Sequence, residues 1–190
     1  MNIPETYDYL MRARRDLWAK LASVSDEVLA RPLLGGERFH CIKDLVFHIA
    51  GTEDGWLHYT ILEDEPVQHT LASVRDIPDG PFCADVPLDT LLDYWRAVEQ
   101  STLGYLAGLK DDDLKRLVYD SPTERYMLDG LLWHVLLHEV RHTAQIVMLL
   151  RMQDISPPAL DLFFYLPSFP AAPEDNQHSA GTSSSEDSPT

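Results

Sequence analysis

The feature that most constrains the fold is a helical period that continues through most of the chain. Apolar residues recur at spacings of three and four, and no segment shows the strict alternation of a half-buried strand. These stripes predict four long helices with mostly short connections, at about residues 4–23, 41–63, 87–108 and 121–153. The fold class that follows is all-α, an up-down four-helix bundle around one core.

The last of these helices has the clearest start signal in the sequence. Ser121-Pro122-Thr123-Glu124 offers an N-cap serine, a proline at the first helical position and a glutamate three residues after the serine. The apolar stripe that follows ends near Gln153. We therefore expect the fourth helix to run from Ser121 to about Gln153.

The segments outside the long helices differ in character. The apolar stretch SPPALDLFFYL predicts a short C-terminal helix that packs back on the domain. The sequence after it is rich in Pro, Ser, Asp and Glu and is predicted to be disordered. We expect one domain over residues 1–166 and a disordered acidic tail over 167–190. The connection 65–86 is long for a helical domain, and it is either a lid over a pocket or a plain surface loop.

Charge and composition narrow the possible partners. The formal net charge is −16, and such a surface repels phosphate backbones, which disfavours nucleic-acid binding. No apolar run approaches the roughly 20 residues needed to cross a bilayer, and the N-terminus lacks the apolar region of a signal peptide. We expect a cytoplasmic protein that binds neither nucleic acid nor membrane.

Neither of the two cysteines has a partner at a metal-binding or redox spacing. Cys41 and Cys83 match no pattern such as C-x-x-C, and we expect two free thiols. Cys41 falls near the predicted start of a helix, where a thiolate can be favoured. The simpler interpretation is that Cys41 is a small packing or weak capping residue.

The histidines form the most informative pattern in the chain. His134, His138 and His142 are spaced by four, and Gln145 follows three residues later, so all four share one face of the fourth helix. Imidazoles among core leucines need partners for their nitrogens, and a metal ion is one such partner. His48 lies on the apolar face of the second helix. We predict a metal site of His48, His138 and His142 with positions left open for water or substrate, and we expect His134 and Gln145 to orient the ligands or line the pocket.

The stretch HEVRH also matches H-E-x-x-H, in which a zinc protease uses the glutamate as general base. The protease motif needs a further ligand downstream, but Gln145 and Met148 stand where its extended form has glycine and histidine. The only later glutamates lie in the predicted tail. A zinc protease is therefore disfavoured, and Glu139 is expected to pair with Arg141 or Arg125, with a general-base role left open.

The other histidines and two aromatic residues on the second helix receive simpler interpretations. Trp56 and Tyr59 continue the apolar face of His48 and are expected in the core rather than against a substrate. The histidines expected to be solvated are His40, His58, His69 and His178.

Two longer stretches, SDEVLARPLLGGERFHCIKDLVFHIAGTEDGWL and LLWHVLLHEVRHTAQIVMLL, and the closing DLFFYL carry a family resemblance. Over about residues 5–166 the chain resembles the DinB-like family of four-helix metal-binding proteins. By this resemblance His48, His138 and His142 match the family's metal triad. Arg141 stands where many members carry another histidine, and residues 143–144 are Thr-Ala where many have arginine-glycine, so substrate specificity does not transfer.

The resemblance also implies a class of activity. The DinB-like family includes YfiT-like proteins described as metal-dependent hydrolases, and S-transferases that use low-molecular-weight bacterial thiols. It implies a divalent-metal enzyme. All-imidazole ligation suits Zn, Ni, Cu or Fe, and Zn or Ni is the expected ion. The expected activity is that of a thiol S-transferase or hydrolase acting on a small electrophilic substrate, in a stress or damage response. No catalytic residue is assigned. The alternatives are a non-enzymatic stress-associated metal-binding protein and a homodimeric interaction protein.

Overall fold

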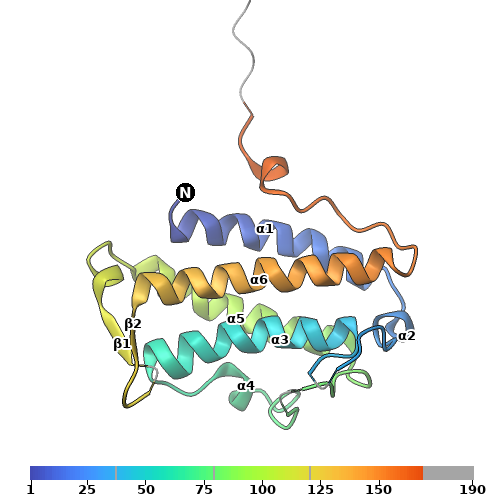
Figure 1. Ribbon diagram of the computed structural model, residues 1–190, viewed down its shortest axis with the longest axis horizontal. Coiled ribbons are helices and arrows are strands. Elements are labelled where there is room, and N and C mark those ends of the chain that lie inside the picture. The colour runs from blue at the N-terminus through green and yellow to red at the C-terminus, as the bar shows by residue number, and fades with distance from the viewer. Residues whose placement is uncertain (37, 79, 120, 169–190) are drawn as a thin grey trace, which may run out of the picture.

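The protein, described by a computed structural model over residues 1–36, 38–78, 80–119 and 121–168, is mainly helical, as the periodicity predicted. Four long segments lie side by side in Figure 1. They are α1 (Ile3–Ala22), α3 (Ile42–Asp54) with its continuation η1 (Gly55–Leu62), α5 (Leu88–Gly108) and α6 (Leu128–Arg151). The shorter elements are α2 (Asp26–Leu29), α4 (Val67–Thr70), η2 (Asp113–Lys115), β1 (Leu117–Tyr119), β2 (Arg125–Met127) and η3 (Leu162–Tyr165).

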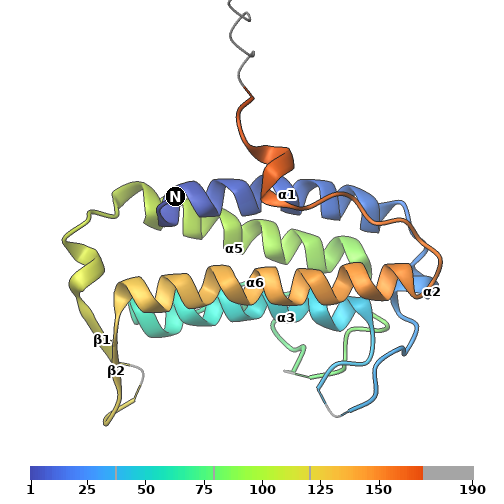
Figure 2. The ribbon, with the colours of Figure 1, turned by 45° about the horizontal axis from the view of Figure 1, so that its top comes forward.

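The long helices do not alternate in direction along the chain. Helices α1 and α3 each pack against both α5 and α6. Figures 1 and 2 show α3 and α5 running in the same direction, with α1 and α6 opposite to them, so the strict up-down order expected from the sequence is not seen. The cause is the connection 63–87, which is long enough to return the chain along the whole length of the helices before α5 begins.

The start of the fourth helix was predicted wrongly. Helix α6 begins at Leu128, and the chain before it forms an antiparallel hairpin in which Leu117 pairs with Met127. The hydroxyl of Ser121 does accept a backbone hydrogen bond from Glu124, at 3.0 Å, but it closes the hairpin turn instead of capping a helix. A serine hydroxyl satisfies either kind of turn, so this local signal could not separate them.

The second predicted helix changes its winding at Gly55. Segment η1 is a π-helix, whose wider turn breaks the three-and-four spacing that the sequence suggested. Tyr59, expected in the core, is therefore 72% exposed. His58, expected to be solvated, is buried beside Asp54 and Ser101, with a ring nitrogen 2.7 Å from each side chain. Both expectations were wrong for the same geometric reason.

A buried ionic network joins the four long segments. The guanidinium of Arg14 on α1 is completely buried and donates to Glu139 on α6 at 2.6 Å, to Glu99 on α5 at 2.9 Å and to Glu53 on α3 at 3.2 Å. Arg15 forms a second ion pair with Glu99. Apolar clusters lie on either side of this network. The network therefore joins the four long segments to one another in the interior of the protein.

The connection after η1 is packed against the long helices. The Asp54 carboxylate accepts the backbone N–H groups of Val67 and Gln68, each at 2.9 Å, and thereby fixes the start of α4. Val74 and Cys83 of the same connection are completely buried in the core. Hydrogen bonds and buried side chains thus hold this connection against the helices, so it is not a lid that opens freely. Its residue Gln68 lines a cavity described below.

The C-terminal segment packs on α1, as expected, but as a single 3₁₀ turn. The Tyr9 hydroxyl donates to the Leu160 carbonyl at 2.6 Å, and the Tyr165 hydroxyl donates to Asp16 at 2.6 Å. Most of the predicted tail, 169–190 with His178, lies outside the described residues. Among the helices that the structure describes, none combines the length and apolar character needed to span a membrane.

Candidate metal centre

Three histidines from two helices meet where α3 packs against α6. His48 comes from α3, and His138 and His142 come from α6; one nitrogen of each ring lies within 4.8 Å of the others. Nε2 of His48 and Nε2 of His138 are 3.1 Å apart, and the rings of His138 and His142 lie with centroids 4.3 Å apart. The spacing of four on α6 places its two rings on successive turns of one face. The residues predicted as a triad are thus brought together.

Burial keeps His138 and His142 neutral. Burial, followed by the neighbouring His142 and His48, lowers the pKa of His138 to about 3. Burial also lowers the pKa of His142, against the opposing effect of its hydrogen bond to Gln145. A neutral imidazole exposes a lone pair, which is the form that binds a metal. At neutral pH His138 and His142 are therefore available as ligands.

Gln145 sets the orientation of one ring. Its side-chain oxygen lies 2.6 Å from Nδ1 of His142. Because an amide oxygen can only accept, Nδ1 of His142 carries the proton and Nε2 presents its lone pair. This is the orienting contact that the sequence suggested for Gln145.

His134 lies at the edge of the group. It is exposed, and its ring centroid is 5.9 Å from that of His138 and 5.2 Å from that of the half-buried Trp56. It belongs to the same histidine row but is not one of the three that converge.

The donor set fits a divalent metal with open coordination positions. Zinc–imidazole bonds of about 2.0–2.1 Å in tetrahedral geometry place ligand nitrogens about 3.4 Å apart, close to the spacing of the His48 and His138 nitrogens. Within the described ranges, no fourth His, Cys, Asp or Glu joins the group. Three protein ligands with open positions are typical of catalytic sites, whereas four are typical of structural ones.

Glu139 does not share the site. Its carboxylate accepts two hydrogen bonds from the buried Arg14, at 3.0 Å from Nε and 2.6 Å from Nη2. The prediction that Glu139 pairs with a basic residue is confirmed. The predicted partners, Arg141 and Arg125, are wrong. A glutamate held by Arg14 is not placed as the general base of a metalloprotease, so the geometry disfavours that interpretation of HEVRH.

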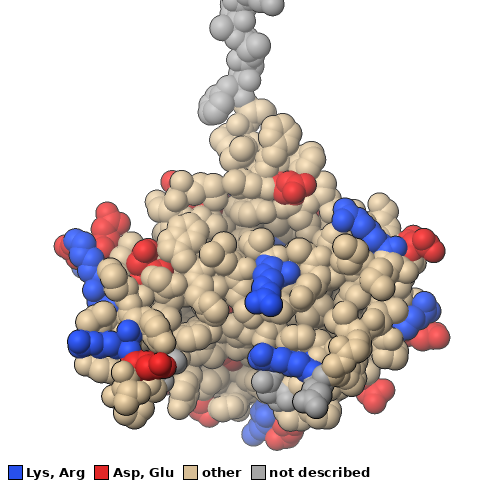
Figure 3. Space-filling model, in the orientation of Figure 1, with Lys and Arg blue, Asp and Glu red and all other residues tan. Residues whose placement is uncertain are grey.

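A small cavity and two arginines flank the triad. The cavity, about 180 Å³, is lined by Arg38, Gln68 and His48 among others. Arg141 and Arg38 both act on His142 to lower its pKa further. Figure 3 shows basic side chains near the middle of the face that carries α6 and α3, with most acidic ones toward its edges. Two arginines therefore lie within electrostatic reach of the triad on a strongly acidic protein.

Sequence reasoning missed two loop residues beside the triad. The Phe39 ring packs on His48 with centroids 4.5 Å apart, and Arg38 lies over Phe39 with its guanidinium 5.4 Å from the ring centre. Both precede α3 in a segment with no periodic pattern. Nothing in the sequence alone marked them.

The two thiols of the chain are poor nucleophiles. Cys41 is the N-cap residue of α3, and burial raises the pKa of its thiol to about 11; burial raises that of Cys83 to about 12. The capping interpretation of Cys41 holds, and a thiolate at neutral pH is disfavoured.

Comparison with known proteins gives a consistent assignment of fold. The sequence model of the DinB family matches residues 1–175. A solved structure, the crystal structure of a conserved protein from Enterococcus faecalis, superposes with a TM-score of 0.64 at 20% identity, over 80% of this chain and 97% of that one. At that identity the likeness concerns the fold alone. No curated protein matches the chain.

Proposed function

The chain belongs to the DinB family, and from that premise we propose that His48, His138 and His142 bind one divalent metal ion. The observation that supports this most is the convergence of three imidazoles from two helices with no fourth side chain of the described region completing the set. Imidazole nitrogens are suitable ligands for Zn and Ni, which remain the proposed ions. We also infer that the four long segments form a closed four-helix bundle, supported by the pairing of α1 and α3 with both α5 and α6.

The proposed activity is transfer of a low-molecular-weight thiol to a small electrophile, or hydrolysis of such a substrate. A divalent ion at this site supplies Lewis acidity and favours the deprotonated form of a thiol or water. Arg38 and Arg141 add positive charge that favours the same anions. The chain's own thiols are buried and protonated, so the thiol comes from a co-substrate. The cavity beside His48 suits a small molecule.

The test uses untagged protein loaded with Zn or Ni. Turnover is measured with a panel of bacterial thiols and a chromogenic electrophile, and separately with esters in the absence of thiol. We expect turnover in one of the two assays, lost in His48→Ala and kept in the surface control Arg96→Ala. Protein that binds metal but turns over neither panel would refute the proposed activity and favour the non-enzymatic alternative.

One observation favours self-association as a second property. Apolar side chains that are largely exposed follow one side of α6, and such a stripe on a helix often marks an interface between copies. They are Leu137, Val140, Met148 and Met152. Sedimentation at several concentrations tests this proposal, and a monomer at 100 μM (an order-of-magnitude choice for weak dimers) would refute it.

A further inference from the structure

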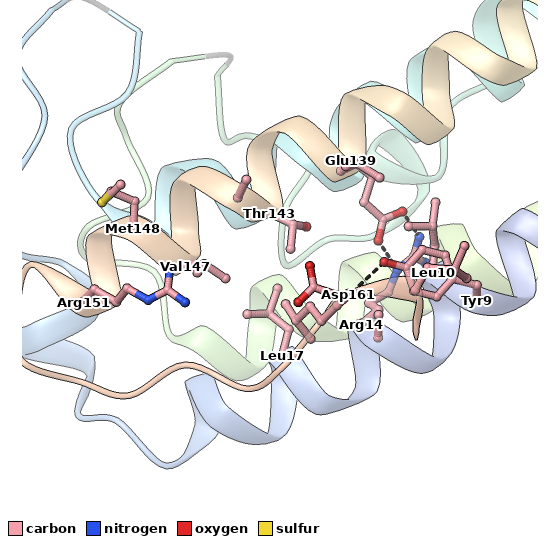
Figure 4. A pocket seen from close by; sticks show the side chains of 15 residues that line it. Tyr9, Leu10, Arg14, Leu17, Glu139, Thr143, Val147, Met148, Arg151 and Asp161 are labelled. Carbon is pink, nitrogen blue, oxygen red and sulfur yellow. Dashed lines mark hydrogen bonds and ion pairs between the residues drawn. The ribbon is translucent and has the colours of Figure 1, made fainter. Parts of the chain in front are cut away.

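A second cavity, of about 480 Å³, lies between α1, α6 and the C-terminal segment (Figure 4). None of the three converging histidines lines it. Helix α6 contributes Glu139, Thr143 and Val147 to this cavity, whereas His138 and His142 point toward α3. The volume is that of a typical small-molecule site. The cavity is therefore separate from the candidate metal centre, and the inference drawn from it is independent of the proposed activity.

The third wall of this cavity is held in place by α1. Tyr9 donates to the Leu160 carbonyl at 2.6 Å, Arg12 donates to the Tyr165 carbonyl at 3.0 Å, and Tyr165 donates to Asp16. Leu160, Asp161 and Leu162 line the cavity from this segment. Because these hydrogen bonds fix the segment on both sides of Asp161, the opening has a defined shape. A ligand would meet a preformed site.

The remaining walls are mostly apolar. Leu10, Ala13 and Leu17 come from α1, and Val140 and Val147 come from α6. A ligand that fills this space buries hydrocarbon against them, at about 25 cal/mol per Å² of apolar surface.

Negative charge gathers at one end. Glu139 and the exposed Asp161 line the cavity, as does Arg14, whose guanidinium is bonded to Glu139. After burial itself, both carboxylates act to raise the pKa of Tyr9, whose hydroxyl lies at the same end. Asp161 forms no ion pair within the part of the chain that the structure describes. In Figure 4 the Arg151 side chain stands at the opposite end from Glu139. The cavity is thus polarised along its length.

The buried ionic network next to Glu139 adds to the excess of negative charge at this end of the cavity. Two guanidiniums, of Arg14 and Arg15, face three carboxylates, of Glu53, Glu99 and Glu139. One negative charge is left over, and burial raises the pKa of Glu139 despite the neighbouring Arg14. A cation placed beside Glu139 would offset this charge in a medium of low dielectric constant.

We propose that this cavity binds a small organic cation, a primary amine with an apolar body, with its ammonium group between Glu139 and Asp161. The apolar body lies along Leu17 and Val147. Arg151 at the far end repels a second positive charge, so a monoamine is selected over a diamine of the same length.

The test titrates the full chain with hexylamine, hexanol, hexanoate and 1,6-diaminohexane, followed by calorimetry and by NMR shifts of α1 and α6. We expect hexylamine to bind at least tenfold more tightly than the other three. Asp161→Asn should weaken hexylamine at least tenfold, and Val147→Trp, which fills the cavity, should abolish binding. The affinity for hexylamine should be unaltered in two control variants, the matched surface change Asp93→Asn and the metal-site change His48→Ala.

Equal binding of hexylamine and hexanol would overturn the proposal, because the charge would then play no part. Binding that persists in Val147→Trp, or NMR shifts confined to residues near His48, would overturn it as well. So would concentration-dependent shifts of the α1 lining residues Leu10, Ala13 and Leu17 without amine, since a second copy of the chain would then cover the cavity itself and not only the exposed stripe of α6.

Discussion

Replacing Arg14 by methionine probes the network that aligns the helices. The guanidinium is completely buried and bonded to carboxylates from three other segments. Removing one partner of a buried ion pair costs about 3–5 kcal/mol, because the remaining charge stays out of water without compensation. With a total stability of about 5–15 kcal/mol for a domain, we expect Arg14→Met to lose about 4 kcal/mol and to fold only marginally.

The assay is urea unfolding followed by far-UV circular dichroism. At a slope of about 2.5 kcal/mol per M, a loss of about 4 kcal/mol moves the midpoint down by about 1.5 M. The control is Arg96→Ala, which removes a partly exposed pair with Asp93 and should change stability by less than about 1 kcal/mol.

The destabilisation should also depend on pH. Burial already raises the pKa of Glu139, and loss of Arg14 removes the main opposing charge, so this pKa rises further. A group with a raised folded-state pKa contributes stability below its unfolded pKa and loses it as the pH rises through the folded value. The deficit of Arg14→Met should therefore be smaller at pH 5 than at pH 8. A deficit under about 1 kcal/mol, or one that does not shrink on acidification, would refute the reasoning.

Further predictions concern the histidine group and the packed connection. Gln145→Leu should weaken zinc binding about 10–100-fold in a chelator competition while the circular dichroism spectrum stays unchanged; unaltered affinity would show that this contact orients nothing. The metal-free protein should lose stability as the pH falls from 6.5 toward 3. His138 has a pKa of about 3 in the folded state against 6.5 in the unfolded state, so in this range only the unfolded state takes up the proton. His138→Leu should flatten this pH dependence of stability in urea titrations, and an unchanged slope would contradict the prediction. Asp54→Ala should cost about 3 kcal/mol, since the N–H of Val67 and the hydroxyl of Tyr94 lose their acceptor; protection of the Val67 amide from hydrogen exchange in the variant would argue against it.

The features predicted correctly from the sequence are those that local spacing determines. The histidine pair on α6 follows from a separation of four residues, and His48 from its place on an apolar stripe. The bounds of α1 and α5 differ from the predicted ranges by a residue at most at each end, because each has a clean stripe ended by a polar or Pro-containing segment. Contacts between distant parts of the chain are not needed to predict these features.

The failures have identifiable physical causes. Ser121 satisfies a hairpin turn as readily as a helix start, and the π-helical winding after Gly55 moves Tyr59 and His58 off the faces that an α-period assigns. The partner of Glu139 is Arg14, which lies 125 positions away in the sequence. A buried arginine is uncommon, and only the folded structure shows which carboxylates compensate its charge. The shared direction of α3 and α5 likewise depends on where the long connection lies.

The central claim is that His48 joins His138 and His142 in binding one metal ion. The most direct test is the metal content of untagged protein, by elemental mass spectrometry, for the wild type and for His48→Ala. The account predicts close to one Zn or Ni per chain in the wild type. It predicts loss of most of that metal in the variant, since one of three ligands contributes about 3 kcal/mol, or roughly a hundredfold in affinity. Full metal content in His48→Ala, or none in either protein, would contradict it.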